Sequence, residues 1–196
     1  MNERSDRAAL IEAVVIGASA GAVQALLKIL PALPVDYPIV ILVVVHVPPD
    51  RSNALVSLFE DKCRLMVKEA EDKERAVAGT IYFAPSDYHL LVEKGGTLAL
   101  SRDDLVNHSR PAIDVLFETA ADCFGPRIVG IVMTGANHDG AAGLKAICAA
   151  GGGVVVEDPI TAATPTMPAA ALDICPSALV RNLDGITDYL LELAVA

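Results

Sequence analysis

The sequence lacks a hydrophobic run long enough to cross a membrane, because no uninterrupted apolar stretch reaches the roughly 20 residues of a transmembrane helix. Residues 1–9 are polar and lack the apolar segment of a secretory signal, so we expect a cytoplasmic protein. Basic residues are also few, with 15 Lys and Arg against 25 Asp and Glu and a formal net charge of −10. An acidic chain is poorly suited to nucleic-acid phosphates, so we expect neither nucleic-acid binding nor membrane insertion.

Cysteines are scarce and scattered along the chain. The four of them form no Cys-x-x-Cys pair, and no histidine lies at a zinc-finger spacing from them. We therefore expect no metal site, and unpaired thiols fit a reducing cytoplasm. Apolar residues are abundant instead, at 53%, against 20% charged residues, as in a compact domain. The length of 196 residues predicts a single domain over 1–196, with about the first 12 residues as a flexible tail.

Apolar runs alternate with helical patterns through most of the chain. Strands are predicted over 13–17, 39–45, 65–68, 81–83, 128–133 and 154–156. Helices are predicted over 22–30, 51–63, 111–124, 141–149, 168–174 and 186–194. Two alternating segments, 89–93 and 97–101, flank Lys94-Gly95-Gly96 and predict a β-hairpin. This order predicts a three-layer α/β/α fold, with helices on both faces of a mostly parallel, Rossmann-like sheet and one inserted β-hairpin.

A Gly-x-Ser-x-Gly pattern spans residues 17–21, between the first predicted strand and the first predicted helix. In this setting Ser19 stands on a sharp turn that lifts its hydroxyl above the sheet edge, as in a nucleophile elbow. The backbone N–H of Ala20 follows the nucleophile and is the natural first donor of an oxyanion hole. The pattern alone fits a phosphate-binding turn of a nucleotide fold equally well, and a purely structural tight turn is a third interpretation.

Two further polar residues follow predicted strands at the same sheet edge. His46 ends the strand over 39–45, and consecutive strands are usually neighbours, so His46 should lie beside Ser19. A dinucleotide site favours an acidic residue at the end of this second strand, and none stands there. Asp139 lies in the glycine-bounded loop after the strand over 128–133. Taken singly, His46 fits a strand cap and Asp139 a helix cap, but together with Ser19 they predict a Ser–His–Asp relay.

At these residues the chain resembles the catalytic domain of chemotaxis protein-glutamate methylesterases (CheB), from about residue 14 to residue 191. The matching segments occur in the family's order and spacing. They are Ile16-Gly17-Ala18-Ser19, His46-Val47-Pro48-Pro49, Val67 to Asp72, Ala84-Pro85 with Asp87 and His89, Ser109-Arg110-Pro111 with Asp114 to Phe117, Met133-Thr134-Gly135 with Asp139 to Gly143, and Met167-Pro168 with Ala170-Ala171. The resemblance puts Ser19, His46 and Asp139 on the family's catalytic serine, histidine and aspartate.

The resemblance implies a carboxylic ester hydrolase that removes methyl esters from glutamate side chains. Its implied protein partners are the cytoplasmic helices of methyl-accepting chemotaxis receptors, and some members also deamidate receptor glutamines. Ser19 would attack the ester carbonyl, methanol would leave, and water would release the glutamate. No metal or organic cofactor is implied. Family members commonly carry a receiver domain in front; we expect none here, so that control falls to a separate receiver or signalling protein, or the activity is constitutive.

The active-site loop departs from the family pattern Gly-Met-Gly-x-Asp-Gly, because residues 135–140 read Gly-Ala-Asn-His-Asp-Gly. Ala136 stands in place of a methionine beside the oxyanion site, and Asn137 replaces a glycine. His138 adds a titratable group that is either an exposed loop residue or a modifier of the site. These changes favour one alternative function, a receptor-binding or regulatory module with weak or no catalysis.

Two residues outside this loop complete the predicted site. Ala20 replaces a hydroxyl residue of the family at the elbow but keeps its backbone donor. Arg110 is expected to help hold an acidic receptor helix near the cleft, and a solvated cation near a helix start explains it equally well.

Overall fold

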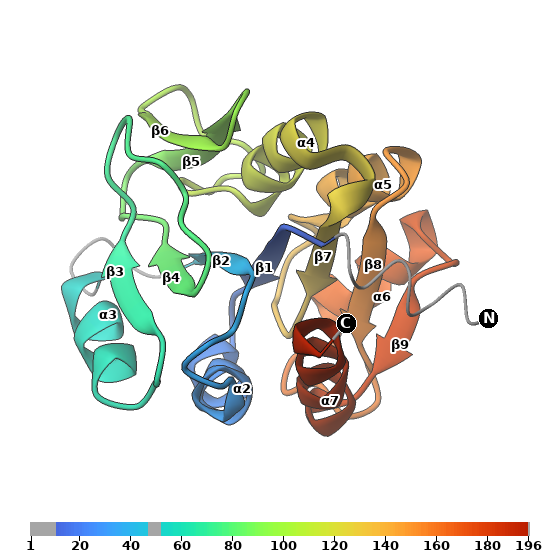
Figure 1. The fold of residues 1–196 in the computed structure, drawn as a ribbon. Coiled ribbons are helices and arrows are strands. Elements are labelled where there is room, and N and C mark those ends of the chain that lie inside the picture. The colour runs from blue at the N-terminus through green and yellow to red at the C-terminus, as the bar shows by residue number, and fades with distance from the viewer. Residues whose placement is uncertain (1–10, 47–51, 196) are drawn as a thin grey trace.

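A central parallel sheet organises the structure, a computed structural model in which residues 11–46 and 52–195 are described. Most of the predicted N-terminal tail, and Val47 to Pro49 of the family match, lie outside these residues. Within them, seven strands pair in the order β3-β4-β2-β1-β7-β8-β9, and every pairing is parallel (Figure 1). The strands are β1 (Ala13–Ala18), β2 (Val40–Val45), β3 (Met66–Glu69), β4 (Thr80–Phe83), β7 (Ile128–Val132), β8 (Gly153–Glu157) and β9 (Leu179–Arg181).

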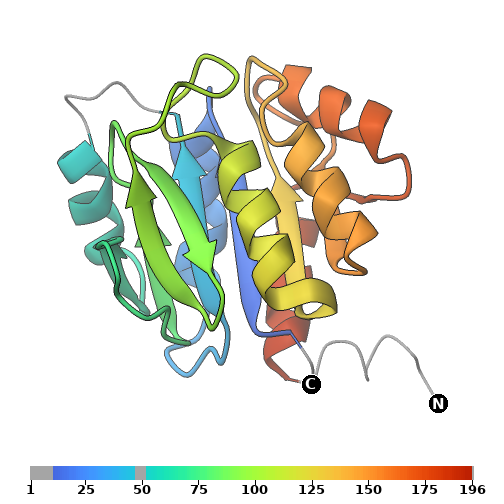
Figure 2. The same cartoon turned by 90° about the horizontal axis from the view of Figure 1, so that it is seen from above.

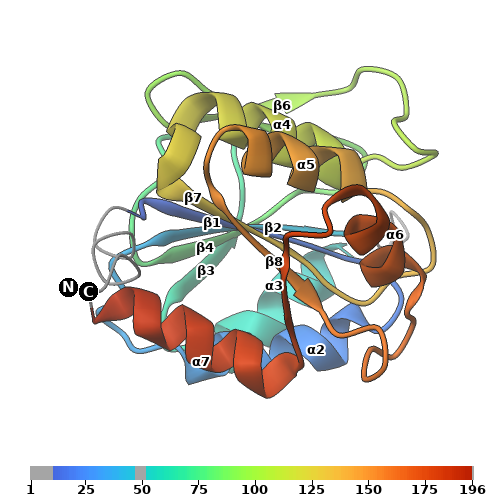
Figure 3. The same cartoon turned by 90° about the vertical axis from the view of Figure 1, so that its right-hand side faces the viewer.

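Helices cover both faces of this sheet, which confirms the predicted three-layer fold. On one face lie α2 (Ala22–Ile29), α3 (Ser52–Glu60) and α7 (Leu183–Ala194). On the other lie α4 (Ile113–Phe124), α5 (Ala141–Ala149) and α6 (Thr166–Ile174) (Figure 3). The predicted hairpin forms from β5 (His89–Glu93) and β6 (Thr97–Ser101), and it lies beside α4 on that face (Figure 2).

The two layers of core follow from the strand sequences. β1 and β2 are buried along their whole lengths, as expected of apolar, largely β-branched strands in the middle of a parallel sheet. Successive side chains of a strand point to opposite faces. Val14 and Ile16 therefore belong to the core under α2 and α7, whereas Ala13 and Val15 belong to the core under α4 and α5.

The structure also differs from the sequence prediction in places. Strand β9 was not predicted, because it is only three residues long; it forms by pairing with the edge of β8. Helix α4 begins at Ile113, two residues after the predicted start, and α6 begins two residues earlier than predicted. Helix α3 spans nine residues, fewer than the predicted 51–63. None of these differences moves a strand that carries a predicted site residue.

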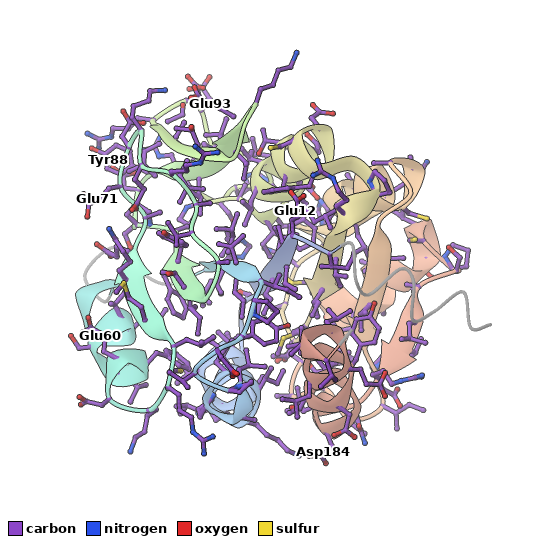
Figure 4. All side chains as sticks on the ribbon, in the orientation of Figure 1. Glu12, Glu60, Glu71, Tyr88, Glu93 and Asp184 are labelled. Atoms are coloured by element: carbon purple, nitrogen blue, oxygen red, sulfur yellow. The ribbon has the colours of Figure 1, made fainter. Side chains whose placement is uncertain are left out.

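The surface carries exposed acidic side chains, and the helices are short. Acidic side chains project outward from several separate elements, as Glu60, Glu71, Glu93 and Asp184 show in Figure 4. Three of these four form ion pairs, Glu71 with Lys68, Glu93 with Lys73 and Asp184 with Lys28. Over residues 11–46 and 52–195, every helix is too short or too polar to span a bilayer.

The sheet order determines where a ligand site forms. Strand β1 pairs in parallel with β2 on one side and with β7 on the other, so the order in which strands are added to the sheet reverses at β1. In open α/β sheets, ligands bind in the crevice outside the carboxyl ends of the strands at such a reversal. The residues that follow β1, β2 and β7 are Ser19, His46 and the loop that carries Asp139.

Candidate active site

Ser19 occupies a tight turn between β1 and α2. Its backbone N–H donates to the carbonyl of Thr134 at 2.9 Å, which ties the turn to the loop after β7. Gly21 has a left-handed φ of 87°, and a Cβ there would lie 2.8 Å from the Cβ of Ala163. Only glycine fits this conformation and this space. The turn leaves the Ser19 side chain partly exposed at the carboxyl edge of the sheet.

His46 continues the register of the neighbouring strand. Ala18 pairs with Val45, and the His46 N–H donates to the carbonyl of Ala18 at 3.2 Å, so Ser19 and His46 follow one another across adjacent strand ends. The imidazole Nε2 lies 2.8 Å from Asp139 Oδ2. The side-chain exposures are 14% for His46 and 0% for Asp139, so this contact is screened from water. The structure thus brings the predicted base and acid into direct contact.

Asp139 is held by many donors. Its Oδ2 accepts from His46 Nε2 and from the Ile113 N–H at 2.6 Å. Its Oδ1 accepts from Asn107 Nδ2 at 2.8 Å and from the N–H groups of Asp114 and Gly140, both at 3.1 Å. Burial alone would raise the pKa of Asp139, but the hydrogen bonds from His46, Ile113 and Asn107 outweigh burial and hold the pKa below its ordinary value. The carboxylate therefore stays ionised and accepts only.

A second carboxylate, Asp114, is linked to Asp139 by shared hydrogen bonds. Asn107 Nδ2 donates to Asp114 Oδ2 at 2.7 Å as well as to Asp139 Oδ1, so one amide group bridges the two acids. Burial raises the pKa of Asp114, the Gly143 N–H opposes this, and the charge of Asp139 raises it further. Sequence reasoning gave Asn107 no role. Its backbone has a left-handed φ of 51°, which asparagine tolerates, but no local pattern signals a contact with Asp139.

The other imidazole nitrogen faces the active-site loop. Asn137 Nδ2 lies 3.4 Å from His46 Nδ1, and Asn137 Oδ1 accepts the N–H of Asp139 at 3.1 Å. Within the described part of the chain, the Ser19 hydroxyl forms no hydrogen bond with His46. Because Nε2 is bound to the carboxylate, Nδ1 is the nitrogen that remains to take a proton from a hydroxyl.

A buried network joins the serine turn to the loop after β7. Thr134 Oγ1 donates to the Ala20 carbonyl at 2.7 Å and accepts the Thr164 N–H at 2.9 Å. The Thr134 N–H donates to Glu157 Oε2 at 2.7 Å, and burial raises the pKa of Glu157. Gly135 lies close to the buried Met167, because a Cβ at this position would lie 2.5 Å from Met167 Cε and would force that side chain to move. No function was predicted for Glu157, which directly follows the predicted strand over 154–156 and ends β8 (Gly153–Glu157) at the same edge.

The remaining predicted residues lie around this core of the site. Ala20, Ala136 and His138 are exposed, on the serine turn and on the loop before Asp139. Their roles stay predictions. Among the described residues, no group of three or more His, Cys, Asp or Glu side chains is arranged to hold a metal ion.

Arg110 is part of a structural ion-pair cluster before α4. Its Nε donates to Asp87 Oδ1 at 3.0 Å, and its Nη1 donates to the carbonyls of Arg102 at 3.2 Å and Asp103 at 2.9 Å. Arg102 also pairs with Asp87, and these hydrogen bonds hold the pKa of Asp87 below its ordinary value. Arg110 thus anchors the segment that carries Asn107, and contact with a substrate stays a prediction.

Comparison with known proteins identifies the family and agrees with the fold. Residues 14–190 match the family model described as CheB methylesterase. A relative from Leptospira interrogans, named putative protein-glutamate methylesterase/protein-glutamine glutaminase, is 43% identical over 182 residues, which are 93% of this chain and 94% of that protein. One from Symbiobacterium thermophilum, named protein-glutamate methylesterase/protein-glutamine glutaminase, is 35% identical over 89% of this chain and 48% of its own length. The crystal structure of the Thermotoga maritima CheB methylesterase catalytic domain superposes with a TM-score of 0.89 at 33% identity, covering 93% of this chain and 98% of that one.

Proposed function

Because this chain belongs to the CheB methylesterase family, we propose that it hydrolyses methyl esters of glutamate side chains on methyl-accepting chemotaxis receptors. The reaction class, carboxylic ester hydrolysis, is that of its relatives. Ser19 is the nucleophile, His46 the general base, and Asp139 the acid that orients the imidazole. The observation that carries the proposal is the 2.8 Å contact between His46 Nε2 and the buried Asp139, at the strand end next to Ser19.

The chemistry follows from the hydrogen bonds around the imidazole. Asp139 accepts the hydrogen bond of the Nε2–H group and stays ionised, so Nδ1 takes the Ser19 proton as Oγ attacks the ester carbonyl. The Ala20 N–H, at the start of α2, and the loop at Ala136 stabilise the oxyanion that forms. The imidazolium then gives its proton to the methoxide oxygen as the bond to the acyl carbon breaks, so methanol leaves and the glutamyl group stays esterified to Ser19 Oγ. A water molecule, activated by the same nitrogen, releases the glutamate and restores Ser19.

The same attack on a glutamine side chain releases ammonia, so deamidation of receptor glutamines belongs to the proposal. The substrates are cytoplasmic receptor helices, which places the work of the enzyme in the cytoplasm. We interpret residues 1–196 as a single catalytic domain, and the reaction described above requires no cofactor. Arg110, which holds the segment before α4 through Asp87 and Asp103, is also proposed to help bind an acidic receptor helix.

The test is methanol release from methylated receptor fragments by the native chain and by Ser19→Ala. Ser57→Ala removes a hydroxyl from an exposed position on α3 and is the matched control. We expect Ser19→Ala to abolish the release and Ser57→Ala to leave it unchanged. A fluorophosphonate probe should label the native chain at Ser19. Equal rates for native and Ser19→Ala chains would overturn the proposal, and receptor binding without turnover or labelling would favour the regulatory module.

A further inference from the structure

We propose that Asn137 is a positioning residue that caps the catalytic imidazole in the resting enzyme and must swing away before Ser19 can use it. The inference rests on the proposed roles of Ser19 and His46. Its starting point is the position of the Asn137 amide, which contacts the nitrogen that the serine needs. A glycine, which the family pattern has at this position, makes no such contact.

The orientation of the Asn137 amide follows from its second contact. Asn137 Oδ1 accepts the backbone N–H of Asp139 at 3.1 Å, and a backbone N–H can only donate. The oxygen of the amide is therefore fixed, and Nδ2 is the atom that faces His46 Nδ1 at 3.4 Å. Nδ2 carries only hydrogens to offer, so the atom opposite it must present a lone pair.

The state of the imidazole follows from its two neighbours. The ionised Asp139 carboxylate accepts at Nε2, so Nε2 carries the proton. The Asn137 amide donates at Nδ1, so Nδ1 carries the lone pair. This is the tautomer that a general base needs.

The cap competes directly with the nucleophile. Nδ1 has one lone pair, and a hydrogen bond from Asn137 occupies the direction that Ser19 Oγ–H needs. This accounts for the missing Ser19–His46 hydrogen bond among the described residues. The contact is long at 3.4 Å, which marks a weak bond. Asn137 is itself half-exposed between the exposed Ala136 and His138, so its side chain has solvent to rotate into.

Two substitutions at this position should act in opposite directions. Asn137→Gly removes the cap and should raise the rate of hydrolysis of a small ester, p-nitrophenyl acetate, by about 2- to 10-fold, the value of one net hydrogen bond. Asn137→Asp keeps an acceptor for the Asp139 N–H but replaces the donor by a carboxylate. The carboxylate holds a proton on Nδ1, so the rate at neutral pH should fall more than tenfold. A merely structural role would make both variants slower.

The protonation of the ring is the second readout and does not require activity. We would follow the ¹⁵N resonances of His46 against pH in the inactive Ser19→Ala background, with and without Asn137→Asp. Three other ionisable groups stay unchanged in these variants: Asp139, which contacts Nε2, Asp114, which shares the Asn107 amide with Asp139, and His138, which precedes Asp139 in the chain. We expect an unprotonated Nδ1 while Asn137 is present, and a doubly protonated ring that persists to higher pH once Asn137→Asp is introduced.

Asn182 offers a matched control, because its Oδ1 also accepts a backbone N–H, that of Gly185, at the start of α7. Asn182→Gly and Asn182→Asp should leave the rate unchanged. Slower hydrolysis by Asn137→Gly, or an unchanged titration of the His46 ring in Asn137→Asp, would refute the proposed role of Asn137. Failure of the proposed function gives a different result, namely equal rates of hydrolysis for the native and Ser19→Ala chains. In that case the titration of the His46 ring would still test the contact with Asn137.

Discussion

Replacement of Asp139 by asparagine tests the arrangement of the site most directly. Three donors converge on Oδ1, from Asn107 and the N–H groups of Asp114 and Gly140, whereas Oδ2 accepts from His46 and Ile113. In the Asp139→Asn variant, the amide oxygen of the new side chain should therefore take the place of Oδ1, and its NH₂ group the place of Oδ2. This NH₂ group then faces His46 Nε2 and the Ile113 N–H, where only an acceptor fits.

The Asp139→Asn replacement should lower both the rate of hydrolysis and the stability of the fold. The new NH₂ group forces the proton of the imidazole from Nε2 to Nδ1, and a base with the wrong tautomer costs about 10⁴-fold in kcat. That factor is about 5.5 kcal/mol of transition-state stabilisation. The buried Ile113 N–H, which donates at 2.6 Å in the native chain, loses its acceptor, at a cost of about 1–3 kcal/mol of unfolding free energy. For a domain of this size, this corresponds to a Tm lower by roughly 2–12 °C.

Initial rates of ester hydrolysis and thermal unfolding followed by circular dichroism would measure the two parts separately. Asp188→Asn makes the same chemical change on the exposed side of α7 and should alter neither. If Asp139→Asn kept more than a tenth of the native kcat with a normal Tm, the hydrogen-bond assignment around the imidazole would be refuted.

Three further predictions concern the network around the site. Glu157→Ala leaves the buried Thr134 N–H without its acceptor and should lower the unfolding free energy by about 1–3 kcal/mol. Glu157→Gln keeps an acceptor and removes a buried charge, so its melting temperature should equal or exceed that of the native chain; a Glu157→Gln variant less stable than Glu157→Ala would contradict this account. Gly135→Ala places a methyl group 2.5 Å from Met167 Cε and should cost about 1–3 kcal/mol, part of which Met167→Ala should restore in the double variant. The lowered pKa of Asp139 stabilises the fold above the ordinary aspartate value of about 3.9, and this contribution is lost as the pH falls through the folded-state value. Urea titrations should therefore show that the difference in unfolding free energy between the native and Asp139→Asn chains becomes smaller in acid. A difference that does not change with pH would contradict the lowered pKa of Asp139.

The sequence alone was sufficient for elements whose signals are local. The run over 39–45 is apolar and largely β-branched, so it predicted a buried strand, and β2 forms over Val40–Val45. The hairpin was predicted with its observed bounds, because alternating side chains flank a glycine turn. β9 carries no such signal, since its pairing with the edge of β8 decides it.

For the site, the sequence determined which strands end in Ser19 and His46 and which loop carries Asp139, and therefore that all three belong to one edge of the sheet. Only the tertiary structure decided which imidazole nitrogen faces the acid, that Asn107 bridges two carboxylates, and that Asn137 faces the remaining nitrogen. The physical reason is separation along the chain: His46 and Asp139 stand 93 residues apart. Hydrophobic periodicity and turn residues carry information about residues that are close in the sequence. Hydrogen bonds between segments that are far apart in the sequence depend on how the helices pack on the sheet.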